Sequence, residues 1–359
     1  MTAGLIAFIL YLYFFVGFSS LFSVLSSLNT ANYILYYSFA ILATVLSILF
    51  VAAAWHDLLK SLSVKVKLRS VFLYTWAGYF VDLVVPCQAV CGEVTRIYLV
   101  HQENRENYGP IAASSLTNRI ISYFMSSVGL LSGIVLVLTR LDAVPPLVLE
   151  LLMIGLVGTC IYLGVLFYLA IKEEAAGKLA GLLFKVVGAL KLSKYLSSDL
   201  PERTQNALRV FHQGFQTFRS KPRSLVKPFV YQLLSLLLNI SVFVLVFFSL
   251  GLTNLHLDFF IIVYFIVGTI QIAAAVFSVG ALDIALANLF LAYGVPDIGV
   301  AAIATTLLRF LTFWMPVVVG YVTVQAIGAR RLLNPKATEA ITAQQKIKGE
   351  PSNVNPPLD

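Results

Sequence analysis

Six long apolar stretches constrain the fold of this chain more than any other feature. Each is long enough to cross a bilayer as a helix, which takes about 20 residues. They cover residues 3–24, 31–55, 110–139, 145–171, 226–250 and 298–327. Of the 359 residues 59% are hydrophobic and 12% are charged, whereas a soluble domain carries about 25% charge. The sequence therefore predicts an all-α, polytopic helical membrane protein without room for a large soluble catalytic domain.

The basic residues predict the orientation of these helices. Twenty of the 25 Lys and Arg residues fall in the segments 56–70, 172–227 and 328–359. Basic segments beside apolar spans stay in the cytoplasm and contact anionic lipid headgroups. The net charge of +8 therefore predicts membrane lipids as partners, and no nucleic acid. We expect a multi-pass protein of the cell (plasma) membrane with both termini cytoplasmic.

Two further apolar segments are interrupted, and we interpret both as re-entrant. If 71–100 crossed the membrane once, the basic segment 172–227 would lie outside the cell, against the positive-inside rule. The conflict disappears if 71–100 enters from the cytoplasm, breaks near Pro86 and Gly92, and returns. Segment 258–294 would enter from outside and break near Gly280, although about 20 uncharged residues precede that break and a full crossing stays open.

Ionisable residues in the apolar segments recur at one spacing. Glu93 and Arg119 are 26 residues apart, and Asp283 and Arg309 repeat this spacing 190 positions later. Charges at membrane depth are costly and usually face a cavity, a substrate path or one another. We therefore expect two repeat units, about 71–139 and 258–327, related by inverted topology around a polar centre, as in many secondary transporters.

A gapless alignment of 74–125 with 264–315 supports the repeat. It contains seven identities, which include two glycines, an arginine and a methionine: Tyr74/Tyr264, Gly78/Gly268, Leu99/Leu289, Gly109/Gly299, Ala112/Ala302, Arg119/Arg309 and Met125/Met315. We expect a single integral membrane domain over 1–327. Its insert at 172–227 is predicted to form cytoplasmic amphipathic helices, either at the membrane interface or as a solvated hairpin. The tail at 328–359 is predicted to be a disordered cytoplasmic segment.

The same residues resemble a known family. Pro86, Gly92, Glu93 and Arg96 form the motif P-x-x-x-x-x-G-E-x-x-R, and a Gly-initiated helix with Arg119 follows. Further along the chain are G-x-x-[acid] and R-x-x-x-x-W, formed by Gly280, Asp283, Arg309 and Trp314. Over roughly 70–327 the chain resembles the lysylphosphatidylglycerol synthase transmembrane, or flippase-like, family. It departs from the pattern at Val276, in place of the usual Pro, and at Asp283, in place of Glu.

The resemblance implies a lipid substrate. Bacterial members with aminoacyl-lipid synthase activity carry a soluble aminoacyl-transferase domain after this membrane domain, which acts as the flippase. Other members are associated with polyprenyl-phosphate glycosyl carriers. The polar 328–359 segment leads us to expect no transferase domain here and no enzymatic activity. We therefore predict a flippase-like transporter of an anionic phospholipid or a polyprenyl-phosphate-linked lipid headgroup.

The predicted substrate-binding residues are Glu93, Arg96, Arg119, Asp283 and Arg309. Arginine suits bidentate phosphate contacts, and Asp283 would receive a cationic or hydroxylated headgroup or exchange a proton. Asp82 and Gln271 could line the same cavity. The alternative is two static acid–Arg pairs that hold each broken segment to its neighbour, because a buried pair needs no substrate to exist.

Two other functions stay open. One is a membrane transferase that acts on lipid substrates, with Glu93 or Asp283 as base. The other is a lipid-binding partner of a separately encoded glycosyltransferase or lipid-modifying enzyme. Cys87 and Cys91 have the i, i+4 spacing of one helix face near His101. A metal site there is conceivable, but no second ligand cluster accompanies them. We interpret the two cysteines as small packing residues outside any disulfide framework, and expect no catalytic residues, metal or cofactor.

Overall fold

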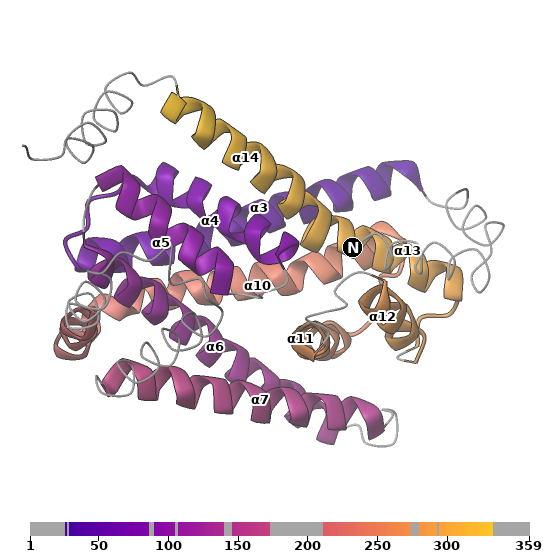
Figure 1. Ribbon diagram of the computed structural model, residues 1–359. Coiled ribbons are helices and arrows are strands. Elements are labelled where there is room, and N and C mark those ends of the chain that lie inside the picture. The colour runs from indigo at the N-terminus through magenta and orange to yellow at the C-terminus, as the bar shows by residue number, and fades with distance from the viewer. Residues whose placement is uncertain are drawn as a thin grey trace, which may run out of the picture.

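The computed structural model describes residues 26, 29–85, 90–104, 107–139, 146–172, 211–273, 280–292 and 294–332. All regular structure in these ranges is helical (Figure 1). The main helices are α3 (Thr30–Ser61), α4 (Leu68–Val84), α5 (Val90–Asn104), α6 (Tyr108–Leu138), α7 (Pro146–Ile171), α10 (Val226–Ser249), α11 (Leu257–Ala273), α12 (Ala281–Ala292), α13 (Ile298–Arg309) and α14 (Met315–Leu332). A short 3-10 turn, η4 (Pro222–Leu225), leads into α10.

Five segments of the described residues are long and apolar enough to cross a membrane. They are Thr30–Ser61, Tyr108–Leu138, Val148–Tyr168, Pro222–Ser249 and Ile298–Gly328. Five of the six predicted spans and the all-α polytopic fold are thereby confirmed. The sixth predicted span, 3–24, lies outside the described residues.

Helices α3 and α10 form an antiparallel pair in the middle of the bundle. Near one end the rings of Tyr36 and Phe248 meet edge to face at 5.8 Å, and nearer the other end Phe50 stacks on Tyr231 at 5.9 Å. Asn29 caps α3, because its side chain accepts hydrogen bonds from the backbone N–H groups of Ala31 and Asn32.

Helices α4 and α5 form an antiparallel hairpin. At its tip, Gly92 N donates to Asp82 Oδ1 (2.7 Å), and at its base the Tyr74 hydroxyl donates to Glu103 Oε2 (2.7 Å). After the break the chain thus returns to the end of the bundle where α4 began. Re-entry of this hairpin into a bilayer stays a prediction, and Pro86 lies outside the described residues.

Gly92 also has a packing role that its sequence position did not indicate. It lies in the first turn of α5. A Cβ on Gly92 would stand 2.4 Å from the Gly78 carbonyl oxygen and 2.2 Å from Asp82 Oδ2. The missing side chain therefore lets α5 approach α4 closely enough for the hydrogen bond to Asp82.

Helices α11 and α12 form a second, looser hairpin. The Phe259 and Phe290 rings, near the start of α11 and the end of α12, lie 6.5 Å apart and both contact Phe247 of α10. Gly280 directly precedes α12 with φ +87°, a conformation that L-residues rarely adopt. Figure 1 shows α11 and α12 almost end-on, whereas α3, α6, α7, α10 and α14 run across the view. The α11–α12 hairpin thus lies steeply across the bundle.

Glycines let α11 lie directly on α6 and α7. A Cβ on Gly129 of α6 would stand 1.8 Å from the Phe265 ring, and a Cβ on Gly155 of α7 would stand 2.1 Å from Thr269 Oγ1. Phe265 and Thr269 are themselves buried. We conclude that close packing through these two glycines sets the steep angle of α11.

This packing predicts a contrast between two glycines of α7. Gly155→Ala should lower the free energy of unfolding by about 1–3 kcal/mol, because the added methyl overpacks a buried contact. Gly158→Ala is the matched control, since no heavy atom lies within 4 Å of its ideal Cβ, and it should be neutral or stabilising by up to about 1 kcal/mol. Thermal unfolding in detergent measures both. Equal effects of the two changes would contradict the packing described for α11.

The basic residues gather at one end of the bundle, which we call the basic end. The end of α3, the start of α4, the end of α5 and the start of α6 lie there, on the left in Figure 1. Three of the Lys and Arg residues whose side chains are described, Arg96, Arg119 and Arg309, lie inside the bundle. The others with described side chains all lie at the basic end: Lys60, Lys65, Lys67, Arg69, Lys172, Arg219, Lys221, Arg223 and Lys227. The fold therefore agrees with the charge asymmetry on which the predicted orientation rests.

Residues 211–220 form a helix that packs on the bundle at the basic end. A Cβ on Gly214 would touch Ala113 Cβ of α6 at 2.9 Å and Leu62 Cδ1 at 3.5 Å. Phe215 packs against a cluster that includes Leu163 and Leu166 of α7. This part of the predicted insert is thus anchored to the transmembrane helices, and residues 173–210 lie outside the described residues.

The orientation is tested by labelling single cysteines, introduced after Cys87, Cys91 and Cys160 are replaced by alanine. Ser63, exposed at the basic end, and Thr253, exposed between α10 and α11 at the opposite end, are suitable positions. In right-side-out vesicles an impermeant thiol reagent should label Ser63→Cys only after lysis and Thr253→Cys at once. Labelling of Ser63→Cys in intact vesicles would reverse the orientation.

One π turn interrupts the last span. Phe310–Trp314 form it, between α13 and α14, and Met315 N donates to Phe310 O, five residues back. Pro316 follows, has no N–H, and its ring would clash with the Thr312 carbonyl in a regular α-helix. The π turn accommodates this proline, and it lies directly beside Arg309, which matches the frequent occurrence of such turns at functional sites.

A polar cavity at half depth

A cavity of about 480 Å³ lies at the centre of the bundle, and we call it the central cavity. Its walls come from α3, α4, α5, α6, α10, α11, α12, α13, the π turn and α14. Five charged side chains line it: Asp82, Glu93, Arg96, Arg119 and Arg309. Both predicted repeat units therefore contribute arginine to one cavity.

The two arginines that the predicted repeat relates lie at matching positions from opposite ends of the bundle. Arg119 is the twelfth residue of α6, counted from the basic end, and Arg309 is the twelfth residue of α13, counted from the other end. Each is the twelfth of the 31 residues of its apolar span, about 6 Å short of the midpoint at 1.5 Å per residue. The two arginines therefore flank the middle of the spans from opposite ends, which places the cavity near half depth.

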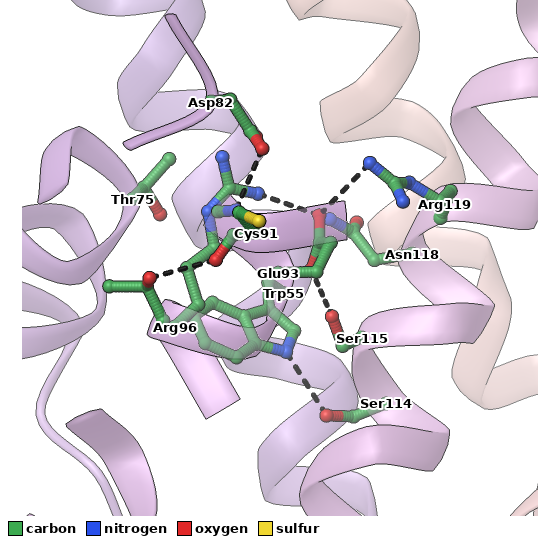
Figure 2. A network of polar contacts seen from close by, with 12 residues as sticks. Trp55, Thr75, Asp82, Cys91, Glu93, Arg96, Ser114, Ser115, Asn118 and Arg119 are labelled. Atoms are coloured by element: carbon green, nitrogen blue, oxygen red, sulfur yellow. Dashed lines mark hydrogen bonds and ion pairs between the residues drawn. The ribbon is translucent and has the colours of Figure 1, made fainter. Parts of the chain in front are cut away.

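Glu93 organises the first half of the site. Its Oε1 accepts a hydrogen bond from Arg96 Nη1 at 2.9 Å and lies 3.8 Å from Arg119 Nη2, as Figure 2 shows. The Ser115 hydroxyl of α6 donates to Oε2. The Arg96 guanidinium also lies over the Tyr79 ring, 4.8 Å from its centroid. One carboxylate thus joins α5 to α6 and holds two arginines of like charge near each other.

Asp283 organises the second half. Its Oδ1 accepts from Arg309 Nε at 2.7 Å, and its Oδ2 accepts from Gly280 N at 2.8 Å. The Arg309 guanidinium lies 4.7 Å from the centroid of the Phe313 ring in the π turn. Glu93 and Asp283 both stand in the first turn of their helices, α5 and α12, where the helix dipole favours negative charge.

The two halves differ in how closely the acid and the arginine are paired. The Arg309 and Asp283 side chains are 7% and 5% exposed, and both carboxylate oxygens of Asp283 accept short hydrogen bonds. The Arg119 and Glu93 side chains are 15% and 17% exposed, and their 3.8 Å separation is longer than a hydrogen bond. Equal spacing in the sequence gave no sign of this asymmetry.

Uncharged polar side chains complete the wall. Gln232 Nε2 of α10 donates to Asn118 Oδ1 of α6 at 2.8 Å, and both side chains are buried. Thr44, Ser122 and Asn239 also line the cavity. The hydrogen bond shows that Asn118 bridges two helices. Gln232 was missed, although it is a lone amide in an apolar span, which is a signal for such a bridge.

Asp82 lines the central cavity, as the sequence had suggested, whereas the Gln271 side chain lies outside the described residues. Our interpretation of Cys91 as a packing residue outside any disulfide is wrong, because Cys91 is disulfide-bonded. Cys87 lies outside the described residues. The described residues contain no group of three His, Cys, Asp or Glu side chains placed to hold a metal ion.

Fold and site together define a polytopic membrane protein with a charged cavity at half depth. The model of the family described as the lysylphosphatidylglycerol synthase TM region matches residues 1–320, and the chain belongs to this family. No curated protein and no solved structure matches the chain.

Proposed function

We propose that this protein translocates the headgroup of an anionic lipid, either a phospholipid or a polyprenyl-phosphate-linked lipid, across the membrane through the central cavity. The observation that carries the proposal is that Arg96, Arg119 and Arg309, from both units, line one cavity at half depth. Membership of a family named for a lipid synthase's membrane region supports a lipid as the substrate.

The chemistry of the cavity suits a phosphate ester. Guanidinium groups are always charged and offer paired N–H donors that match phosphate oxygens. The amides and hydroxyls of Asn118, Gln232, Asn239 and Ser122 are available for the hydroxyl groups of a headgroup. The volume, about 480 Å³, falls within the roughly 300–1,000 Å³ typical of small-molecule sites. The acyl or prenyl chains would stay in the bilayer.

The inverted placement of the two half-sites supports an alternating-access mechanism. Arg119 is reached along α6 from the basic end, and Arg309 along α13 from the opposite end. Movement of one hairpin and its neighbouring helix against the other would open the same arginines first to one side and then to the other.

Reconstitution in liposomes tests the proposal. Full-length protein is inserted into vesicles that contain phosphatidylglycerol with a fluorescent acyl chain, and dithionite quenching reports which lipid is on the outer leaflet. We expect protein-dependent movement of the labelled lipid without chemical change. A new lipid product would favour a transferase instead. If neither labelled phosphatidylglycerol nor a labelled polyprenyl phosphate moves, and no product forms, the protein is a lipid-binding partner and our proposal is wrong.

A further inference from the structure

We propose that Asp82 is a proton-binding site that couples headgroup binding to protonation: Asp82 takes up one proton when an anionic headgroup enters the central cavity. This inference rests on the proposed function.

The charges in and beside the central cavity balance. Arg96, Arg119 and Arg309 contribute three positive charges, and Asp82, Glu93 and Asp283, which binds Arg309, contribute three negative charges. A phosphate diester adds one negative charge, which is costly in a site removed from water. Uptake of one proton by a carboxylate restores neutrality. In the empty cavity the same argument favours three ionised carboxylates.

Two of the three carboxylates are poorly suited to accept this proton. Glu93 accepts hydrogen bonds from Arg96 at 2.9 Å and from the Ser115 hydroxyl, and Asp283 accepts from Arg309 at 2.7 Å and from Gly280 N. Protonation of either would break a direct ion pair and leave a buried arginine without its counter-charge, which is strongly unfavourable.

Asp82 has no such ion pair. Its hydrogen bond in the structure is the one from Gly92 N to Oδ1 at 2.7 Å. Within the described residues no Lys or Arg nitrogen lies within 4.0 Å of an Asp82 carboxylate oxygen. A neutral carboxylic acid can still accept from Gly92 through its carbonyl oxygen and donate its O–H to a headgroup oxygen. Asp82 is therefore the carboxylate that changes charge at the lowest cost.

The other ionisable groups that line the cavity come from several helices. They are Tyr79 of α4, Glu93 and Arg96 of α5, Arg119 and Tyr123 of α6, Tyr264 of α11 and Arg309 of α13. Two other helices pack on α4, namely α3 and α14. The charged residues of α3 and the arginines of α14 lie toward the basic end, in their last turns. Asp82 also has no acidic counterpart 190 positions later, where Ile272 stands, so the second unit has no equivalent proton site.

The test measures the binding of fluorescent phosphatidylglycerol by full-length protein in nanodiscs of zwitterionic lipid, between pH 5 and pH 8. Over this range the lipid phosphate keeps its charge. We expect wild-type Kd to fall by up to about tenfold per pH unit as pH decreases, because one proton is bound with each lipid. Asp82→Asn should bind at every pH with the affinity that the wild type reaches at low pH. Asp57→Asn, outside the cavity, is the matched control and should keep the wild-type slope.

A wild-type Kd that is independent of pH, or an unchanged slope in Asp82→Asn, would overturn the assignment while leaving the proposed function intact. Absence of wild-type binding and translocation at every pH would instead remove the proposed function, and this inference with it. If Asp82→Asn does not fold, wild-type protein in weakly buffered solution gives the answer. A pH-sensitive dye should report about one proton taken up per lipid bound, and no uptake would overturn the proposal.

Discussion

Arg309→Gln is expected to lower the free energy of unfolding by about 3–5 kcal/mol, because it leaves a buried carboxylate without its partner. Asp283 is 5% exposed, and its Oδ1 would lose the 2.7 Å hydrogen bond from Arg309 Nε. A second change, Asp283→Asn, removes the unpaired charge and should restore much of the loss. Thermal unfolding of the single and double variants in detergent measures both effects.

The matched change at Arg119 should give the opposite pattern. In Arg119→Gln, Glu93 keeps its 2.9 Å hydrogen bond from Arg96 and the one from Ser115, so stability should fall by less than in Arg309→Gln. Lipid translocation should fall to background, because a guanidinium that would hold the phosphate is lost. Arg119→Lys should also be impaired, since a point charge does not reproduce the planar fork of donors.

Together these variants decide between a binding site and two static pairs. If Arg119→Gln is as unstable as Arg309→Gln, and Arg119→Gln with Glu93→Gln recovers both stability and translocation, the cavity charges are structural. If Arg119→Gln is folded and inactive, the first half of the site binds the substrate. The asymmetry between the half-sites leads us to expect the second result, with Asp283 and Arg309 mainly fixing α12 against α13.

The second large effect should come from filling the cavity. Gly268 of α11 lines it, and no heavy atom lies within 4 Å of the ideal Cβ position. A tryptophan there has open space to enter, and its large indole ring, which typically buries about 150–250 Å², would occupy the space for a headgroup. Gly268→Trp should therefore abolish translocation with little change in melting temperature.

Gly164→Trp on α7 is the matched control for this experiment. Gly164 is exposed on the outside of the bundle and also has no heavy atom within 4 Å of its ideal Cβ. The same substitution there adds the same aromatic surface where lipid chains would surround it, and translocation should stay at the wild-type level. Normal translocation by a folded Gly268→Trp protein would show that the headgroup does not pass through the central cavity.

The sequence predicted the helical fold and the two acid–Arg sets because both follow from the cost of polar groups in lipid. A stretch of about 20 apolar residues has few alternatives to a spanning helix. Charges such as Glu93 and Arg309 must find a polar environment whatever the details of packing. The repeat offset of 190 residues then indicated which charges belong together.

The remaining features depend on tertiary packing that one-dimensional patterns do not contain. The steep angle of α11 arises where Gly129 and Gly155 meet Phe265 and Thr269, residues more than 100 positions later. The close pairing of Asp283 with Arg309 depends on a backbone contact, because Gly280 N donates to Asp283 Oδ2 and fixes the carboxylate. A proline within a span, such as Pro316, does not by itself distinguish a kink from the π turn that forms there.

The balanced charges of the central cavity have an energetic consequence for a protein that works across a polarised membrane. Three arginines and three ionised carboxylates near half depth sum to zero. Moving a net elementary charge through the whole field would involve about 2.3 kcal/mol per 100 mV. A cavity of zero net charge does not incur this electrical energy when it moves. In the proposed transport cycle, the return of the empty cavity would therefore be indifferent to the membrane potential, and voltage would act only through the net charge of what the cavity carries.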